Sequence, residues 1–546
     1  MTRASIALLL FVCLNAPAQV TPDDLLHSPG ADWLTYAGSY NGWRHSPLTQ
    51  ITAGNVGTLT AKWIFRVPNA TGLEATPLVH DGVLYMTDTN SVYALDARTG
   101  RLVWSYVDSR SERKGPNRGA AILGNRIYFV TSDNYLTALD RRSGGVVFSK
   151  RYADFEKGVF STAAPLVVED RVIVGSAGGD SGMRGFVAAL SAETGELLWR
   201  RYTIPSKGEP GSETWGEGGW LEWGGGATWL SGTYDPETDT LFWTTGNPWP
   251  DFNNTVRQGD NLYTCSLLAL DLETGDLKWH FQFTPHDSHD WDAQSWPMLV
   301  ELNWDGVIRK VVLHANRNGF FYVLDRETGE FLRATKLIDS LNWASEIGSD
   351  GRPVLIPGMD PSLEGTWVCP SVKGATNWMG QTYHPGTGLL YLLTLEQCGW
   401  FTLSEQQPVP MANFSGGGAT ESGGQVILRA IDPETGNRAW EYPMTGIGRM
   451  WTGTVSTATG VIFSGDDAGH LIALDAGTGR HLWHFNLGER LTASPIVYVV
   501  QGQQRVAIAS ATAVVSFGLF EAVSSIDMPE ITIRKPEPSE SVSAPR

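Results

Sequence analysis

Seven consecutive residues of the sequence, HDSHDWD at positions 286–292, combine two histidines with three aspartates. In a strand or an extended loop, residues two positions apart point to the same side, so the carboxylates of Asp290 and Asp292 can converge on one site. Two ionised carboxylates close together raise each other's pKa unless a cation lies between them. A hard metal ion with oxygen ligands meets this requirement best. The alternatives are a solvated acidic turn and a zinc site, but no thiolate or further histidine stands at zinc-ligand spacing.

The overall composition is that of a large, soluble, acidic protein. The 546 residues carry 40 basic and 58 acidic side chains, a net charge of −18. Nucleic acid is therefore not an expected ligand, because its phosphates require a basic surface. A positively charged partner would fit better. After the N-terminus there is no run of about 20 apolar residues, so stable membrane insertion is not expected.

The N-terminal segment MTRASIALLLFVCLNAPAQ has the form of a secretory signal peptide, which we place at residues 1–18. It has an early cation, an apolar run over residues 6–14 and an Ala-Pro-Ala cleavage sequence. A short anchor helix is the alternative, but the run is too short to span a bilayer. We therefore expect a periplasmic protein.

The expected periplasmic location determines how the cysteines should pair. Cys13 would leave with the signal peptide, and in an oxidising compartment two of the remaining three should pair. We predict the disulfide Cys369–Cys398, because Cys265 lies in a strand-like run where a thiol acts as a small buried hydrophobe. No Cys-x-x-Cys-His motif occurs, so no covalently bound c-type haem is expected.

One pattern recurs along the chain: an apolar strand, an Asp (Ser191 in one copy), a turn ending in Thr-Gly or Ser-Gly, and a second strand that leads to an aromatic residue in all clear copies but one. Its seven clear copies are Tyr93–Trp104, Thr137–Phe148, Ala188–Trp199, Leu268–Trp279, Tyr322–Leu332, Arg429–Trp440 and Ile472–Trp483. Two weaker copies, Thr233–Trp243 and Thr382–Tyr391, fill the largest gaps. The Asp side chain begins a turn that the Gly closes, so each copy predicts a β-hairpin. We expect the aromatic residue to end the second strand and to stack on the next unit.

A hairpin of this kind cannot bury its apolar face alone. Copies at a period of about 40–60 residues therefore predict the four-stranded blades of a β-propeller, an all-β fold. We expect one propeller domain over residues 19–525, followed by a loosely ordered C-terminal tail over 526–546, where prolines lie among charges and serines.

The copies with the form Ala-x-Asp-x-x-Thr-Gly-x-x-x-Trp resemble the tryptophan-docking motifs of the quinoprotein alcohol dehydrogenases. This is the methanol and ethanol dehydrogenase family, which uses pyrroloquinoline quinone (PQQ). The resemblance covers nearly the whole chain after the signal peptide. It implies an eight-bladed propeller with the cofactor and a metal ion on the central axis. Because non-catalytic propellers have similar hairpins, the functional inference depends on the residues between the hairpins.

Three segments between hairpins resemble the family's site: EWGGGATW with the later TTGNPWP, then FTPHDSHDWDA, then HANRNG. The resemblance implies a cofactor-stacking Trp229, a metal-binding Asn247 and a catalytic Asp290. Asp292 resembles an additional aspartate of the lanthanide-dependent branch, and Asp180 occupies the place of a metal-binding Glu. Three ionised aspartates suit a 3+ ion, so a lanthanide is favoured and Ca²⁺ is the alternative.

Further positions match the family's contacts to the quinone. These are Glu74, Arg118, Thr162, Gly178, Gly179, Arg317, Asn377 and Trp451. PQQ is a tricarboxylate o-quinone, which requires arginines to neutralise it and a flat aromatic residue to cover it. Each residue taken singly has an ordinary structural explanation, but the ordered set favours a cofactor site. Cys369–Cys398 also fits a family disulfide. One departure is Glu112-Arg113, which stands where many members have an adjacent cysteine pair.

The resemblance implies oxidation of a small primary alcohol to an aldehyde. The metal would act as a Lewis acid on the quinone with help from Arg317, and Asp290 would take the alcohol proton while hydride moves to PQQ. Without a haem motif, the electrons would pass to a separate c-type cytochrome. One alternative is a non-catalytic propeller scaffold of the outer-membrane assembly type, which does not account for the site residues. Another is a calcium quinoprotein that acts on larger alcohols or sugars.

Overall fold

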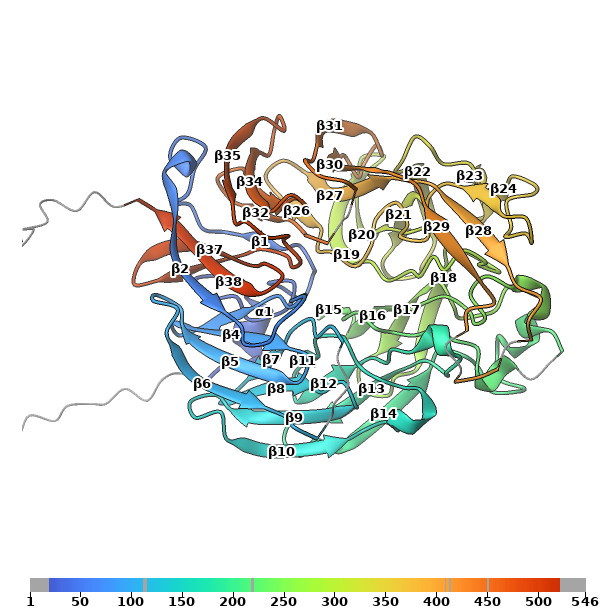
Figure 1. Ribbon diagram of the computed structural model, residues 1–546, viewed down its shortest axis with the longest axis horizontal. Coiled ribbons are helices and arrows are strands. Elements are labelled where there is room, and N and C mark those ends of the chain that lie inside the picture. The colour runs from blue at the N-terminus through green and yellow to red at the C-terminus, as the bar shows by residue number, and fades with distance from the viewer. Residues whose placement is uncertain are drawn as a thin grey trace, which may run out of the picture.

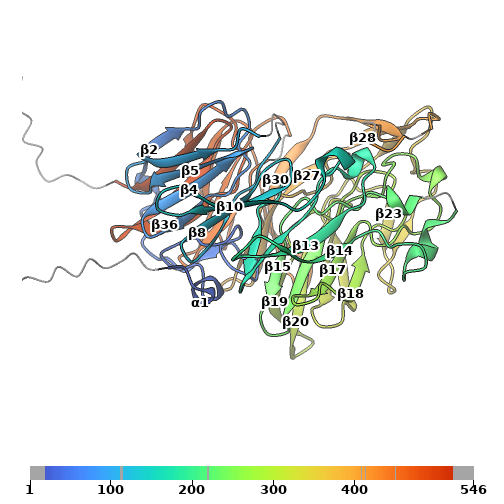
Figure 2. The same ribbon diagram turned by 90° about the horizontal axis from the view of Figure 1, so that it is seen from below.

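The described part of the chain is almost entirely β-structure. The computed structural model describes residues 19–110, 115–217, 220–407, 409–411, 414–448 and 451–520. The predicted signal peptide at 1–18, the predicted tail at 526–546 and the Glu112-Arg113 departure lie outside these residues. Figure 2 shows the short helix α1 (Pro22–Leu26) at the periphery. Within the described ranges, no helix is both long and apolar enough to cross a bilayer.

Eight sheets, seven of four strands and one of five, make up a propeller-like arrangement (Figure 1). The first four sheets consist of β3 (Leu78–His80), β4 (Val83–Asp88), β5 (Ser91–Asp96) and β6 (Leu102–Val107); β7 (Ala121–Leu123), β8 (Arg126–Val130), β9 (Tyr135–Asp140) and β10 (Val146–Arg151); β11 (Leu166–Val168), β12 (Arg171–Val174), β13 (Phe186–Ser191) and β14 (Leu197–Tyr202); and β15 (Thr233–Asp235), β16 (Thr240–Thr244), β17 (Ser266–Asp271) and β18 (Leu277–Gln282). The next two consist of β19 (Met298–Trp304), β20 (Val307–Ala315), β21 (Phe320–Asp325) and β22 (Phe331–Lys336); and β26 (Thr382–His384), β27 (Leu389–Glu396), β30 (Gln425–Ile431) and β31 (Arg438–Pro443). The last two each include a strand from the N-terminal part of the chain: β32 (Val455–Thr457), β33 (Val461–Gly465), β34 (His470–Asp475) and β35 (His481–Asn486) are joined by β1 (His45–Ser46), and β36 (Ile496–Val500), β37 (Gln503–Ala509) and β38 (Ala513–Leu519) are joined by β2 (Leu59–Arg66).

The seven clear repeat copies have one structural role: each forms the hairpin between the last two strands, in chain order, of a sheet. In the first copy, the carboxylate of Asp96 accepts hydrogen bonds from the backbone N–H groups of Arg98 and Thr99, and Gly100 closes the turn at φ +71°. The two weaker copies are not further units. They form the first hairpins, β15–β16 and β26–β27, of sheets that already contain a clear copy.

The eighth sheet contains no copy of the repeat, because it is built from both ends of the described chain. β2 pairs antiparallel with β38, so the blue and red strands lie side by side in Figure 1. Trp63 in β2 takes the position that the repeat aromatic has elsewhere: its indole N–H donates to the carbonyl of Ala97 at 3.0 Å. Tertiary pairing therefore supplies the unit that the repeat does not contain.

The repeat aromatic residues stack on the neighbouring sheet as predicted. The Trp199 ring lies against Gly275, and its indole N–H donates to the carbonyl of Leu272 at 2.9 Å. The prediction that the aromatic residue ends its strand is wrong, since β6 continues past Trp104 to Val107. The ring docks sideways onto the next turn, which leaves the strand free to continue.

Gly275→Ala should test this docking. A Cβ there would lie 2.5 Å from Trp199 Cε3 in a backbone with φ +73°, whereas Gly82 has nearly the same φ, +72°, and no atom within 4 Å. We expect Gly82→Ala to cost about 1 kcal/mol for the left-handed backbone. Gly275→Ala should cost about 2 kcal/mol more because the ring must move. Equal losses in denaturant unfolding would contradict tight docking.

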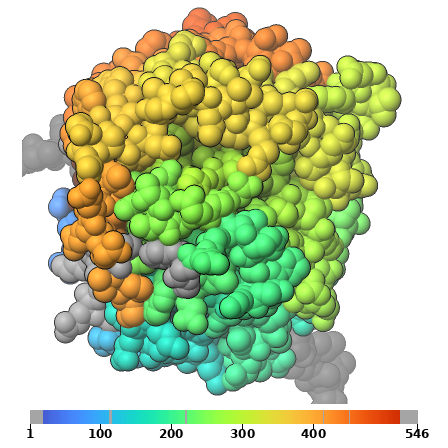
Figure 3. Space-filling model, turned by 90° about the vertical axis from the view of Figure 1, so that its right-hand side faces the viewer, coloured from blue at the N-terminus to red at the C-terminus, as the bar shows by residue number. Residues whose placement is uncertain are grey.

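Between β22 and β30, the described residues of 337–381 and 397–424, which precede and follow β26 and β27 in the sequence, form an excursion from the eight sheets. It contains the small sheets β23 (Ala344–Ile347) with β24 (Pro353–Leu355), and β25 (Thr366–Val368) with β28 (Gly399–Leu403) and β29 (Gly417–Glu421). The predicted disulfide Cys369–Cys398 is present and joins β25 to β28. Cys265 is free and buried, as predicted, although it precedes β17 instead of lying within it. Figure 3 shows the excursion as the broad yellow to orange surface on one side of the molecule.

His314, near the end of β20, gives the fold a defined sensitivity to acid. Its ring is fully buried and stacks on Phe283 with 4.3 Å between centroids, and burial lowers the pKa of His314 to about 3. The folded state cannot take up the proton that the unfolded state accepts below about pH 6.5. This contribution to stability is therefore complete above pH 6.5 and is lost as the pH falls.

For one such histidine the loss amounts to about 2 kcal/mol between pH 7 and pH 5. We expect His314→Gln to reduce the pH dependence of the unfolding free energy by this amount in denaturant titrations at both pH values. His27→Gln, at a side chain that is 71% exposed, is the control for replacing a histidine at the surface. A wild-type pH dependence in His314→Gln would contradict the assignment.

Candidate active site

Nearly all the predicted site residues line one cavity of about 490 Å³. Those that line it are Glu74, Arg118, Thr162, Gly178, Gly179, Asp180, Trp229, Asp290, Asp292, Arg317, Asn377 and Trp451. Asn247 does not line the cavity but lies directly behind Asp292. The fold therefore brings together residues from segments that are widely separated in the sequence.

Asp290 points into the cavity from a tight loop. The sequence suggested an extended segment here, but Asp290 has φ +58°, the left-handed conformation that non-glycine residues rarely adopt. The buried carboxylate of Asp287 holds this turn by accepting hydrogen bonds from the backbone N–H groups of His289 (3.3 Å) and Trp291 (3.1 Å). Asp290 and Asp292 still converge, but because of this turn and not because of strand alternation.

The aromatic residues on either side of Asp290 anchor the loop to the excursion. The rings of His289 and Trp291 stack with 4.3 Å between centroids, and Phe401 of β28 packs against both. The Trp291 indole N–H donates to the carbonyl of Ser371 at 3.0 Å, and His289 Nε2 lies 2.8 Å from the carbonyl of Met359. The excursion is therefore the wall that holds the Asp290 backbone in place.

Asp292 is the most highly connected carboxylate of the site. Its Oδ1 accepts from the Asn247 backbone N–H at 2.7 Å, and its Oδ2 accepts from the Trp229 indole N–H at 3.0 Å and from Arg317 Nη1 at 2.7 Å. The close approach requires a glycine at position 246, where a Cβ would lie 2.4 Å from Asp292 Oδ1. Asp292 thus links three of the predicted residues.

Negative charge concentrates at this end of the cavity. The pKa of Asp180 is raised to about 6, first by burial and next by the charge of Asp292. The Asp180 side chain is nevertheless open to the cavity. The pKa of Asp290 lies well above the usual range because of burial, and the neighbouring aspartates raise it further while Arg317 lowers it. The Arg317 Nη2 atom lies 3.6 Å from Asp290 Oδ2 and 2.5 Å from the carbonyl oxygen of Val372.

These oxygen donors are chemically suited to a hard cation. The amide group of Asn247 donates through Nδ2 to Asp251 Oδ1 at 2.7 Å, and its Oδ1 lies 3.9 Å from the position of a Cβ on Gly179. In the described parts of the chain, no three His, Cys, Asp or Glu side chains are arranged as a completed metal site. The carboxylate of Asp292 instead accepts hydrogen bonds from Asn247, Trp229 and Arg317. Binding of an ion by Asp292 would therefore replace some of these hydrogen bonds.

Around Arg118 the cavity combines a guanidinium with aromatic rings. The Arg118 guanidinium lies 4.7 Å from the ring centroids of both Trp229 and Trp378, and its Nη2 lies 2.8 Å from Glu74 Oε2. Its Nε and Nη1 atoms are buried and have no hydrogen-bond partner within the described structure. Buried donors without partners beside flat aromatic surfaces fit a planar polyanionic ligand such as PQQ.

The remaining predicted residues complete the wall. Thr162 Oγ1 donates to the Trp229 carbonyl at 3.1 Å, and Asn377 Nδ2 donates to the Lys373 carbonyl at 2.9 Å. Gly178, at φ +109°, precedes the short helix η3 (Gly179–Ser181) that presents Asp180. A Cβ on Gly178 would lie 2.2 Å from the Gly158 carbonyl, so this approach requires glycine.

Several functional positions were not predicted. Trp378, next to Asn377, stacks with Trp451 at 6.2 Å between centroids, and Phe160 also lines the cavity. Asp251 lies behind Asn247. Trp378 follows the predicted Asn377 directly, and this position could have indicated that it belongs to the site. Nothing in the sequence around Asp251 indicates that its carboxylate turns back to Asn247.

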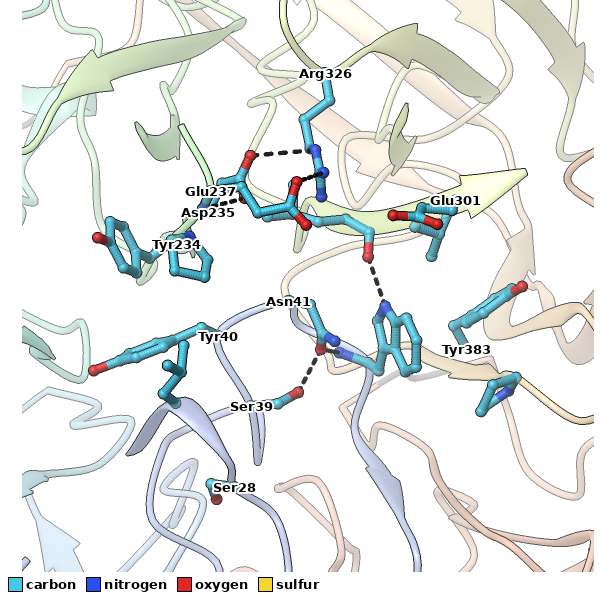
Figure 4. A pocket seen from close by; sticks show the side chains of 16 residues that line it. Ser28, Ser39, Tyr40, Asn41, Tyr234, Asp235, Glu237, Glu301, Arg326 and Tyr383 are labelled. Atoms are coloured by element: carbon cyan, nitrogen blue, oxygen red, sulfur yellow. Dashed lines mark hydrogen bonds and ion pairs between the residues drawn. The ribbon is translucent and has the colours of Figure 1, made fainter. Parts of the chain in front are cut away.

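A second cavity, of about 470 Å³, is lined by residues at the end of β15 that is farther from Trp229 in the sequence (Figure 4). None of the predicted residues lines this second cavity. Three of its charged groups pair with one another: Arg326 lies 3.2 Å from Asp235 and 3.3 Å from Glu237. Trp43 donates to the Leu299 carbonyl at 2.7 Å. The arginine of this cavity is therefore already paired with two carboxylates.

Two family models match separate parts of the chain. A family model described as the β-propeller domain of glucose, ethanol and alcohol dehydrogenases matches residues 33–336. A second model, described as the outer membrane protein assembly factor BamB, matches residues 423–517. The first model covers every predicted cofactor and metal residue except Asn377 and Trp451.

Comparisons with individual proteins extend over most of the chain. The quinohemoprotein alcohol dehydrogenase ADH IIB of Pseudomonas putida is 38% identical, over 92% of this chain and 77% of its own length. The quinoprotein alcohol dehydrogenase PedH of the same species is 36% identical, over 91% of this chain and 89% of its own. A solved europium-containing methanol dehydrogenase has a TM-score of 0.86 and 30% identity, and the match covers 91% of this chain and 100% of that one. The chain therefore belongs to the family of PQQ-dependent alcohol dehydrogenases.

Proposed function

We propose that the protein oxidises a small primary alcohol to an aldehyde with PQQ and one metal ion. The observation that carries this proposal is the convergence on one cavity of twelve predicted residues from separate segments, with three aspartates beside Arg317 and a second buried guanidinium, that of Arg118, against two indole rings. A non-catalytic scaffold has no use for such a cluster.

Asp290 is the proposed general base. A base acts best when its pKa lies near the working pH, and burial moves the pKa of Asp290 in that direction. Arg317 lies close enough to stabilise the ionised carboxylate before the proton is transferred. The supported left-handed turn keeps the Asp290 carboxylate at one place in the cavity, which is what proton transfer over a short distance requires.

PQQ, when bound, supplies an o-quinone that accepts two electrons, and the metal ion supplies Lewis acidity. Arg118 would bind a carboxylate of the cofactor through its unpartnered N–H groups, while Trp229 and Trp378 would cover its faces. The other proposed contacts are Glu74, Thr162, Gly178, Gly179, Arg317, Asn377 and Trp451.

Asp180, Asn247, Asp290 and Asp292 are the proposed metal ligands. The three carboxylates bring three negative charges against the one positive charge of Arg317. This excess favours a trivalent lanthanide over Ca²⁺. The name of the europium-containing relative supports the same choice.

The wider features of the proposal follow from the chain as a whole. We interpret the eight sheets as eight blades of one propeller domain over 19–525, preceded by a signal peptide at 1–18 and followed by a tail at 526–546. Export would place the enzyme in the periplasm. The net charge of −18 would steer a separate c-type cytochrome with a basic face to it as the electron acceptor.

Reconstitution tests the proposal. The metal-free protein is loaded with PQQ and either La³⁺ or Ca²⁺, and dye-linked oxidation of primary alcohols is measured. We expect activity with La³⁺ to exceed that with Ca²⁺. Activity with Ca²⁺ alone would overturn the lanthanide assignment, and a preference for sugars or larger alcohols would overturn the substrate class. Absence of quinone absorbance and of activity with both ions would favour the scaffold function.

A further inference from the structure

Asp251 is a fourth carboxylate at the metal-binding end of the cavity, and the proposed function gives it no role. It follows the turn that begins at Asn247, and it is 2% exposed. Its Oδ1 accepts a hydrogen bond from Asn247 Nδ2 at 2.7 Å. Asp251 is thus a buried acid in direct contact with a proposed metal ligand.

This hydrogen bond determines which end of the Asn247 amide faces the cavity. An amide group has a donor end, NH₂, and an acceptor end, the oxygen. An ionised carboxylate only accepts hydrogen bonds, so Asp251 selects the NH₂ group and directs Asn247 Oδ1 away from itself. The oxygen accordingly lies on the side of Gly179, the residue before Asp180 in the sequence. Only this orientation offers a cation a ligand instead of two N–H groups.

The backbone around Asp251 is held rigidly enough for this role. The fully buried Arg257 donates through Nε to the Pro250 carbonyl at 3.1 Å and through Nη2 to the Asp251 carbonyl at 3.4 Å. Its Nη1 bonds the side chain of Asn261 at 2.8 Å. Arg257 therefore fixes the main chain that carries Asp251, while the Asp251 carboxylate remains directed at Asn247.

Asp251 also adds charge where a cation would lie. The Asp251 carboxylate lies within range of the charge of Asp180, so the two ionised groups would repel each other. A cation held by Asp180 and Asn247 would relieve this repulsion, and a 3+ ion would do so more than a 2+ ion because the Coulomb energy scales with its charge.

We propose that Asp251 is a positioning residue that orients the Asn247 amide oxygen towards the metal ion and favours a trivalent ion over a divalent one. This inference rests on the proposed metal site. Asp251 does not itself contact the alcohol or the cofactor, and its two effects, orientation and charge, can be separated by substitution.

Two substitutions at position 251 distinguish these effects. Asp251→Asn removes the charge but keeps an oxygen that can accept from Asn247 Nδ2. Asp251→Ala removes both. The full-length, PQQ-free and metal-free protein is titrated with Tb³⁺, whose emission is sensitised by nearby tryptophans such as Trp229, and Tb³⁺ is then displaced with Ca²⁺. Asp235→Asn, at an equally buried aspartate in the second cavity, is the matched control.

We expect Asp251→Ala to weaken binding of both ions at least tenfold. Asp251→Asn should keep the affinity for Ca²⁺ within about twofold while lowering the preference for Tb³⁺ over Ca²⁺ about tenfold, and the control should match the wild type. Thermal melting of each metal-free variant checks folding. Wild-type binding of both ions by Asp251→Ala would overturn this inference alone. Failure of the wild type itself to bind either ion would overturn the proposed metal site together with it.

Discussion

Asp290→Asn should lower alcohol oxidation by the PQQ- and metal-loaded protein by about 1,000-fold, within the range for loss of a general base. The amide has nearly the same shape as the carboxylate but cannot accept the alcohol proton. The charge of Arg317, 3.6 Å from the Asp290 carboxylate, would no longer have an ionised base to stabilise in the variant. Steady-state dye-linked rates at saturating alcohol measure the effect.

Stability of the metal-free variant provides a second readout. A carboxyl group whose pKa is raised by folding destabilises the folded state as the pH rises, because folding then opposes its ionisation. Asp290→Asn should therefore melt at the same temperature as the wild type at pH 7, or higher. Asp466→Asn, at a buried aspartate that bonds His470 away from the cavity, should retain full activity. Substantial turnover by Asp290→Asn would show that another group is the base.

Arg118→Leu should weaken PQQ binding about 100-fold, equivalent to about 2.7 kcal/mol, the size expected for losing a buried charged hydrogen-bonding group. The physical reason is that Arg118 is 5% exposed and holds two buried N–H groups without partners in the described structure. A cofactor carboxylate would satisfy them both. Titration of the metal-loaded protein with PQQ, followed by quinone absorbance, gives the dissociation constant.

Arg333→Leu is the matched control for this experiment. Its guanidinium lies over the Trp304 ring at 4.6 Å from the centroid, an arrangement like that of Arg118, but it does not line the cavity. PQQ affinity should therefore be unchanged in Arg333→Leu. If both variants bound PQQ equally well, Arg118 would be a structural arginine and the cofactor would occupy a different part of the cavity.

The repeat explains why so much of the fold could be predicted. In each clear copy the turn is closed by neighbours only a few residues apart, such as Asp96 and Gly100, so local chemistry is sufficient. The weaker copies were misassigned because Thr233–Trp243 has the same turn chemistry at a different position in its sheet. The pairing of β2 with β38 leaves no local pattern, because its partners lie at opposite ends of the described chain.

The sequence by itself determined the types of residue at the site and the hairpins that frame them, because turn formation and metal or cofactor chemistry depend on residue type and short spacing. Tertiary structure decided the orientations. The left-handed turn of Asp290 depends on support from Asp287, and the connections of Asp292 and Asp251 depend on packing between segments remote in sequence. Such contacts form only when the sheets pack, since no segment can direct a side chain towards a partner that is not yet beside it.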